Sequence, residues 1–126
     1  MIVLDTHAWV WWVVAPRRLS PSATRTIETA DRIGVSTTSV FEIVDLERRG
    51  RLTLDAPPRT WIREALAQER VEALPLTAES AVDAAQLAFA GDPADRVIYA
   101  TARAADAKLV TRDERMHGFD PTRVVW

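Results

Sequence analysis

The sequence contains no cysteine. This absence excludes a disulfide framework, a zinc site built on thiolates and a cysteine nucleophile. Two histidines without cysteine are also too few ligands for an ordinary structural zinc site. The composition fits a reducing compartment, and we expect a cytoplasmic protein.

Long apolar segments are missing as well. The longest unbroken apolar run, Ala8–Ala15, has eight residues, whereas a membrane-spanning helix needs about 20. No basic residue precedes Asp5, which interrupts the first apolar run, so we do not expect a secretory signal. The sequence therefore predicts no membrane association.

A surplus of positive charge is also absent. Lysine and arginine total 16 against 18 acidic residues, which gives a net charge of -2. This balance argues against a protein that coats nucleic acid through bulk charge, but it leaves room for a local basic surface. Arg17–Arg18 and Arg48–Arg51 are candidate phosphate contacts, although solvated surface residues explain them equally well.

Short apolar runs alternate with amphipathic segments along the chain. Strands are predicted at Ile2–Leu4, Ile33–Thr37, Val71–Leu76, Lys108–Thr111 and Val124–Trp126. Helices are predicted from Pro21 to Asp31, from Ser39 to the stop at Gly50, around Trp61–Leu66, from Thr77 to Gly91 and from Pro93 to Ala105. This alternation predicts one α/β domain over residues 1–126, with a mostly parallel sheet of about four or five strands flanked by helices.

The segment His7–Val14 is apolar around its whole circumference if it is helical. Such a helix is buried either in a core or against a partner. Trp9, Trp11 and Trp12 favour a subunit interface and core packing about equally.

Four acidic residues follow or flank the predicted strand ends. Asp5 follows the first strand and Glu42 comes shortly after the second, while Asp95 opens a helix and Asp113 follows the fourth strand. Because ligands of open α/β sheets bind beyond the carboxyl ends of the strands, we expect these four carboxylates to converge.

Each acid also has a purely structural interpretation. Ser39 and Glu42 fit a capping box, Asp92 and Asp95 fit the start of a helix, and Asp113 fits the cap of a short turn. Four carboxylates at one edge would nevertheless repel each other, and divalent cations would remove that cost. Mg²⁺ and Mn²⁺ prefer oxygen ligands, and two such ions can assist an in-line phosphoryl displacement.

Four segments that contain these acids resemble the motifs of PIN-domain ribonucleases, specifically the VapC-type toxins of bacterial toxin–antitoxin pairs. They are Ile2–His7, Ser39–Ile43, Asp92–Ala102 and Leu109–Glu114, and the similarity runs from Met1 to Trp126. The resemblance implies that the metal-binding and catalytic acids are Asp5, Glu42, Asp95 and Asp113. It also implies that hydroxyl residues order the site, namely Thr6, Ser39 and Thr111. Tyr99 departs from the small residue usual at its position, and we expect it to narrow the neighbouring substrate space.

The resemblance further implies a Mg²⁺- or Mn²⁺-dependent endoribonuclease, with one or two ions, that acts on structured RNA such as tRNA or ribosomal RNA. A small cognate antitoxin and a toxin homodimer are implied as well. Two alternatives remain open at this point. One is a PIN-like binding module without catalysis. The other is a haloacid-dehalogenase-like phosphatase, which is disfavoured because His7 stands where that chemistry needs a second aspartate.

Overall fold

Five parallel strands form a single sheet in the computed structural model, which describes residues 1–126. The strands are β1 (Ile2–Leu4), β2 (Ile33–Ser36), β3 (Val71–Leu74), β4 (Lys108–Val110) and β5 (Val124–Val125), in the order β3-β2-β1-β4-β5. Leu4 pairs with Val35 on one side and with Val110 on the other. The residues that follow β1, β2 and β4 therefore emerge at the same edge. This confirms the predicted α/β class with a parallel sheet.

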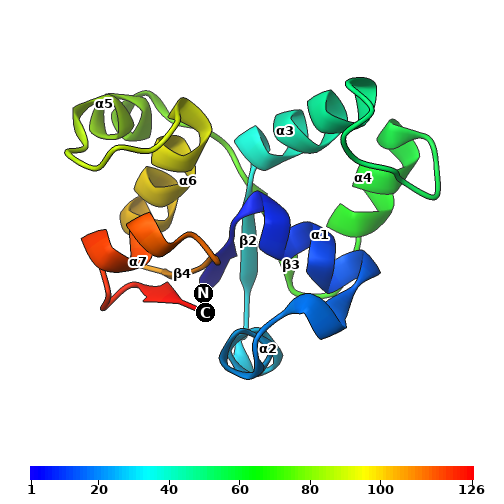
Figure 1. Cartoon of the computed structure of the whole chain (residues 1–126), viewed down its shortest axis with the longest axis horizontal. Helices are drawn as coiled ribbons and strands as arrows, with labels where there is room; N and C mark the ends of the chain where they lie inside the picture. The colour runs from blue at the N-terminus through cyan, green and yellow to red at the C-terminus, as the bar shows by residue number, and fades with distance from the viewer.

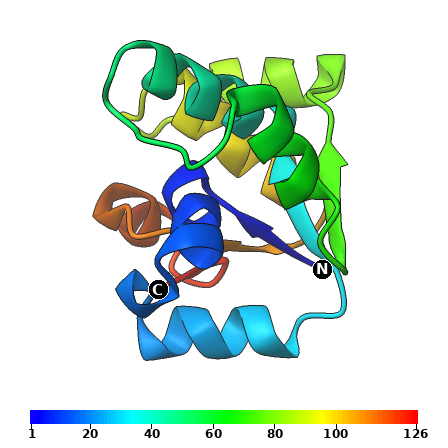
Figure 2. The same ribbon diagram turned by 90° about the vertical axis from the view of Figure 1, so that its right-hand side faces the viewer.

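Seven α-helices and one short 3₁₀ turn at Pro16–Arg18 surround the sheet. The helices are α1 (Thr6–Val14), α2 (Pro21–Thr29), α3 (Thr37–Arg48), α4 (Pro58–Leu66), α5 (Ala78–Gln86), α6 (Pro93–Ala104) and α7 (Glu114–Phe119). Figures 1 and 2 show α2 at one end of the molecule and α3 to α6 at the other. No helix has the length and apolar character that crossing a membrane requires.

The two faces of the sheet carry separate hydrophobic cores. Side chains alternate between faces along a strand, so Leu4 joins a core with Trp9 of α1 and Ile27 of α2. Val3 points the other way and packs with Ile98 of α6. Burial on both faces explains why the strands read as continuous apolar runs rather than as alternating patterns.

Helix α3 begins two residues earlier than the sequence predicts. Its N-cap is Ser36, whose hydroxyl accepts a hydrogen bond from the backbone N–H of Thr38 at 3.1 Å. The predicted capping box between Ser39 and Glu42 is therefore wrong, because both residues lie inside the helix. Their side chains are consequently free to make tertiary contacts. The predicted stop at Gly50 is confirmed, since that residue has a φ of +71° just beyond the last turn.

Helix α5 starts after Thr77 as predicted but ends at Gln86, five residues before the expected stop at Gly91. The cause lies in α6. The Arg96 guanidinium donates hydrogen bonds to the carbonyls of Ala84 at 3.0 Å, Ala85 at 2.8 Å and Leu87 at 3.0 Å. The last carbonyl groups of a helix have no hydrogen-bond partner within it. Arg96 supplies these partners at the end of α5, so the helix can stop there.

The apolar segment after β1 is helix α1, and its burial decreases along its length. Trp9 is fully buried in the core, whereas Trp11 and Trp12 are partly buried. Val13 is 38% exposed and Val14 is 52% exposed. The first half of the helix is therefore core, as one of the two predicted alternatives requires, and its end is an apolar surface that only a partner could cover.

Candidate active site

The four predicted acids line one cleft at the carboxyl edge of the sheet, with a volume of about 900 Å³. Each comes from a different part of the chain. Asp5 follows β1, Glu42 lies in α3, Asp95 is in the first turn of α6, and Asp113 precedes α7. The structure thus brings together side chains up to 108 positions apart in the sequence, as the strand-end rule predicts.

Asp5 is the most enclosed of the four acids, at 9% exposure. Its Oδ1 accepts the backbone N–H of Ala8 at 2.8 Å and so caps helix α1. Its Oδ2 accepts a hydrogen bond from the hydroxyl of Thr111. Burial raises the pKa of Asp5 although both hydrogen bonds act against that rise. Both oxygens are therefore held in fixed positions at the floor of the cleft.

Glu42 is positioned by hydroxyl groups. The hydroxyl of Thr6 donates to Oε1 of Glu42 at 2.5 Å and lies 2.9 Å from the hydroxyl of Ser39. Thr6 and Ser39 are themselves buried. Burial raises the pKa of Glu42, partly offset by the bond from Thr6. The three hydroxyl residues named from the sequence thus each contact an acid or another of their own set.

Asp92 and Asp95 have different roles at the start of α6. Asp92 is the N-cap, because its Oδ1 accepts the backbone N–H of Asp95 at 2.9 Å. Burial, and after it the charges of Asp92, Asp113 and Glu42, raise the pKa of Asp95 from its ordinary value of 3.8 to about 6. Asp95 therefore lies in a strongly negative environment.

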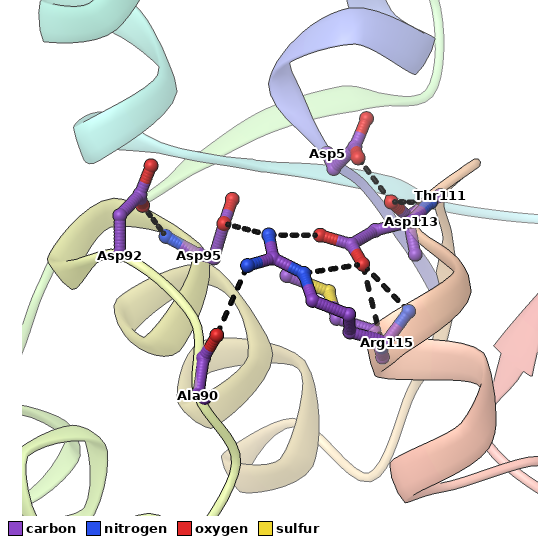
Figure 3. A network of polar contacts seen from close by, with 8 residues as sticks. Asp5, Ala90, Asp92, Asp95, Thr111, Asp113 and Arg115 are labelled. Carbon is purple, nitrogen blue, oxygen red and sulfur yellow. Dashed lines mark hydrogen bonds and ion pairs between the residues drawn. The ribbon is translucent and has the colours of Figure 1, made fainter.

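Arg115 lies between two of the acids, as Figure 3 shows. Its Nη2 is 3.0 Å from Oδ2 of Asp113 and 3.4 Å from Oδ2 of Asp95, and its Nη1 donates to the carbonyl of Ala90 at 3.0 Å. Burial pushes the pKa of Asp113 upward, but hydrogen bonds from Arg115 and from two backbone amides outweigh it, and the pKa is lowered. Arg115 is the internal counter-ion of this acid pair.

Asp113 also caps α7, because its Oδ1 accepts the backbone N–H groups of Arg115 at 2.8 Å and Met116 at 3.3 Å. Asp113 thus both caps a helix and belongs to the cluster of acids in the cleft. Sequence reasoning missed Arg115, and the only signal was its position two residues after Asp113.

The fit of a divalent cation can be tested on the donor set. No three acidic or histidine side chains are close enough to ligate a single ion together as they stand. Mg²⁺, however, is usually held by one or two carboxylates and keeps several waters. The raised pKa of Asp95 also reflects repulsion between carboxylates that a cation would relieve. The donor chemistry therefore fits Mg²⁺ or Mn²⁺.

The five candidate phosphate contacts do not all reach the cleft, and Arg17 is exposed outside it. Arg18 and Arg51 line the cleft, as does Arg112, which sequence reasoning did not single out. Arg48 and Arg49 instead pair with Asp45 on the surface of α3, at 2.7 and 3.1 Å.

Tyr99 does not narrow the cleft, contrary to the sequence-based expectation. It is buried in the core under α6 against Phe89 and Phe119, and its hydroxyl donates to Oδ2 of Asp120 at 2.7 Å. Tyr99 is accordingly not among the residues that line the cleft.

The family model of the PIN domain matches residues 2–120. Because this match covers nearly the whole chain, the chain belongs to the PIN-domain family. Its similarity extends to a particular branch. The chain is 38% identical to ribonuclease VapC22 of Mycobacterium tuberculosis over 126 residues, which cover 98% of this chain and 95% of the relative. Within the family, the chain is therefore a VapC-type ribonuclease.

Solved structures show the same fold. A toxin–antitoxin complex from Klebsiella pneumoniae aligns with a TM-score of 0.73 at 18% identity, covering 100% of this chain and 97% of the other. VapBC2 from Rickettsia felis bound to a promoter DNA fragment aligns with a TM-score of 0.70 at 18% identity and coverages of 98% and 97%. The sarcin-ricin loop cleaving toxin VapC20 of M. tuberculosis aligns with a TM-score of 0.63 at 17% identity and coverages of 98% and 99%. These structures share the fold, and the VapC22 match favours the nuclease over the phosphatase and over the silent binding module.

Proposed function

We propose that this protein is the toxin of a toxin–antitoxin pair and cleaves structured RNA, tRNA or ribosomal RNA, in a reaction that depends on Mg²⁺ or Mn²⁺. The observation that carries the proposal is the convergence of Asp5, Glu42, Asp95 and Asp113 on one cleft in a chain of the VapC type. The cleft contains no side-chain nucleophile of the cysteine type, since the chain has no cysteine. Hydrolysis by an activated water is the chemistry that such acids serve.

The four acids would hold one or two cations, and each is already oriented by its neighbours. Thr111 and the amide of Ala8 fix Asp5, while Thr6 fixes Glu42. A divalent cation bound there supplies Lewis-acid stabilisation of the negative charge that develops on the phosphate oxygens and lowers the pKa of bound water. The chain's own contribution is to hold the acids in place, and a bound cation would relieve the unfavourable ionisation that burial imposes on Asp5, Glu42 and Asp95.

The substrate class follows from the relatives. VapC22 is named a ribonuclease, and VapC20 is described as cleaving the sarcin-ricin loop. An accessible loop of a structured RNA is therefore the substrate proposed for this chain. The structural relatives from Klebsiella and Rickettsia are toxin–antitoxin assemblies, which supports a small antitoxin protein as partner.

A homodimer and a cytoplasmic location complete the proposal. The exposed apolar end of α1, formed by Val13 and Val14, supports self-association because it would be covered in a dimer. Light scattering after gel filtration should give a dimer mass for the wild type and a lower average mass for Val14→Ser. A monomeric wild type would contradict this part alone.

Cleavage of total cellular RNA with Mg²⁺, Mn²⁺ or EDTA, followed by mapping of the cut ends, tests the activity. We expect discrete cuts with either metal and none in EDTA. Asp5→Asn should abolish cleavage and most of the metal-induced rise in Tm, because only the folded site binds metal. The matched control is Asp55→Asn, an exposed aspartate without an ion pair. Equal cleavage in EDTA and in metal would refute the metal dependence, and no cleavage under any condition would refute the nuclease.

A further inference from the structure

The cleft extends from the acids to an aromatic and basic wall, formed by one residue of α1, one of the 3₁₀ turn after it and one that follows β4. We call Trp11, Arg18 and Arg112 the Trp11 platform. The Arg18 guanidinium lies over the indole of Trp11, 4.4 Å from its centroid, and that of Arg112 lies 5.8 Å away. All three residues line the same cleft as the acids. Arg112 directly precedes Asp113 in the chain, so the platform borders the acid cluster.

The arginines of this wall have no partner of opposite charge. Arg18, Arg112 and Arg51, which lines the cleft from the segment after α3, make neither an ion pair nor a side-chain hydrogen bond. By contrast, Arg115 in the same cleft is paired with Asp95 and Asp113. Exposed, unpaired guanidinium groups beside an acid cluster would attract a polyanion that the carboxylates alone repel.

Two other aromatic rings contact the indole of Trp11 at tilted angles. The ring of Trp126 is tilted by 58° at a centroid distance of 5.8 Å, and that of His7 by 57° at 5.9 Å. Trp11 is partly buried, in contrast to the fully buried Trp9 two residues before it. The indole of Trp11 is therefore held in place by neighbouring rings at the wall of the cleft, with the Arg18 guanidinium against it.

We propose that the Trp11 platform binds one unstacked nucleobase adjacent to the phosphate that is cut, and that Arg112 and Arg51 contact the phosphates around it. This inference rests on the proposed function and adds that the RNA must present an unpaired nucleotide at the cut site. Aromatic side chains and arginine planes stack splayed bases irrespective of sequence, whereas the bases of a duplex are stacked on each other and unavailable. The enzyme would therefore select an unpaired loop nucleotide by its exposed face.

Binding measured without cleavage tests this inference. The probes are a fluorescein-labelled RNA hairpin with a single-stranded loop of mixed sequence, the same hairpin with an abasic sugar at each loop position in turn, and a blunt RNA duplex. Fluorescence anisotropy is recorded in EDTA for the wild type, Trp11→Leu and Trp11→Phe. The matched control is Trp12→Leu, which changes the next tryptophan of α1, a residue outside the cleft.

We expect Trp11→Leu to weaken hairpin binding roughly tenfold or more, the scale of one lost base–aromatic stack. Trp11→Phe should restore most of the affinity, and Trp12→Leu should bind as the wild type does. One abasic position should weaken binding to the wild type but not to Trp11→Leu. The duplex should bind weakly and without dependence on Trp11.

Salt dependence gives an independent readout of the arginines. Arg51→Gln and Arg112→Gln should each reduce the slope of log K against log salt by about 0.7, the value per phosphate contact of a single strand. The matched control is Arg17→Gln, an exposed neighbour outside the cleft, which should leave the slope unchanged. These variants carry the test if Trp11→Leu does not fold.

Three results would overturn the inference: Trp11→Leu binds the hairpin as tightly as the wild type, the Trp11 and Trp12 variants lose affinity equally, or no abasic position matters. Loss of antitoxin binding with intact RNA binding in Trp11→Leu would instead identify a protein-docking surface. The proposed function fails separately, because it depends on cleavage of RNA with metal. If the protein binds RNA through Trp11 but never cleaves it, the proposed nuclease activity is refuted and the proposed base-binding role of the Trp11 platform is supported.

Discussion

Replacement of Asp95 by asparagine should stabilise the metal-free protein at neutral pH. The pKa of Asp95 is raised from its ordinary value of 3.8 to about 6 by burial and then by the charges of Asp92 and Asp113. In the unfolded chain the carboxyl ionises near its ordinary value. Above pH 6 the folded state therefore holds an ionised group that its surroundings disfavour, and folding stability is reduced. Asparagine has the same shape and no charge, so this cost disappears.

The size of the effect follows from the pKa difference. At face value the difference corresponds to about 3 kcal/mol. The side chain is 25% exposed, and solvent screening reduces the expected gain to about 1 kcal/mol. For 126 residues, this corresponds to a rise in Tm of about 4 °C. The cost of ionisation is complete above about pH 6 and declines toward pH 3.8, so about a third of the gain should remain at pH 4.5.

Melting curves in EDTA at pH 7.5 and pH 4.5 measure this directly for the wild type, Asp95→Asn and Asp55→Asn. Asp55 is exposed and forms no ion pair, so its variant reports what the same chemical change does outside the cleft. Only Asp95→Asn should show a gain that grows with pH. A lower Tm at pH 7.5, or an equal gain at both pH values, would show that carboxylate repulsion does not act on Asp95.

Three further predictions concern the same cleft. Asp95→Asn should lower the single-turnover cleavage rate about a hundredfold or more, the scale for losing one well-placed electrostatic group, whereas Asp92→Asn should keep most activity because asparagine caps a helix about as well as aspartate. Arg115→Gln should lower the Tm in EDTA and enlarge the rise in Tm on adding Mn²⁺, since the cation no longer competes with a guanidinium; an unchanged metal-induced rise would contradict the counter-ion role. Thr111→Val removes a hydrogen bond that lowers the pKa of Asp5, so the metal-induced rise in Tm should require a higher pH than in the wild type, as a pH series of melting curves would reveal.

The sheet and the convergence of the acids could be predicted because both follow from local rules. Short apolar runs mark buried strands, and parallel strands end at one edge. The start of α3 could not be predicted from capping rules. Ser36, Thr37, Thr38 and Ser39 are four successive residues that can all cap a helix. The end of β2 decides between them, because pairing with β3 keeps Ser36 in the strand.

Contacts between distant segments account for the other differences. Arg96 ends α5 by donating to three of its last carbonyls, and nothing in the sequence of α5 itself records that. The position of Arg115 between Asp95 and Asp113 likewise depends on how α7 meets the start of α6. A sequence pattern identifies the acids by their spacing, but it cannot identify a counter-ion whose role arises only from packing.

Two of the carboxylates proposed to bind a cation, Asp5 and Asp113, also cap helices. One oxygen of Asp5 accepts an amide of α1 and the other faces Thr111, and Asp113 divides its oxygens in the same way between the amides of α7 and Arg115. A helix N-terminus orients a carboxylate and favours its charge. The capping hydrogen bond therefore holds the side chain of Asp5 or Asp113 in one position. Asparagine preserves the capping oxygen and removes the charge, whereas alanine removes both. Asparagine substitutions are therefore the ones that separate the acids' contribution to folding from their contribution to chemistry.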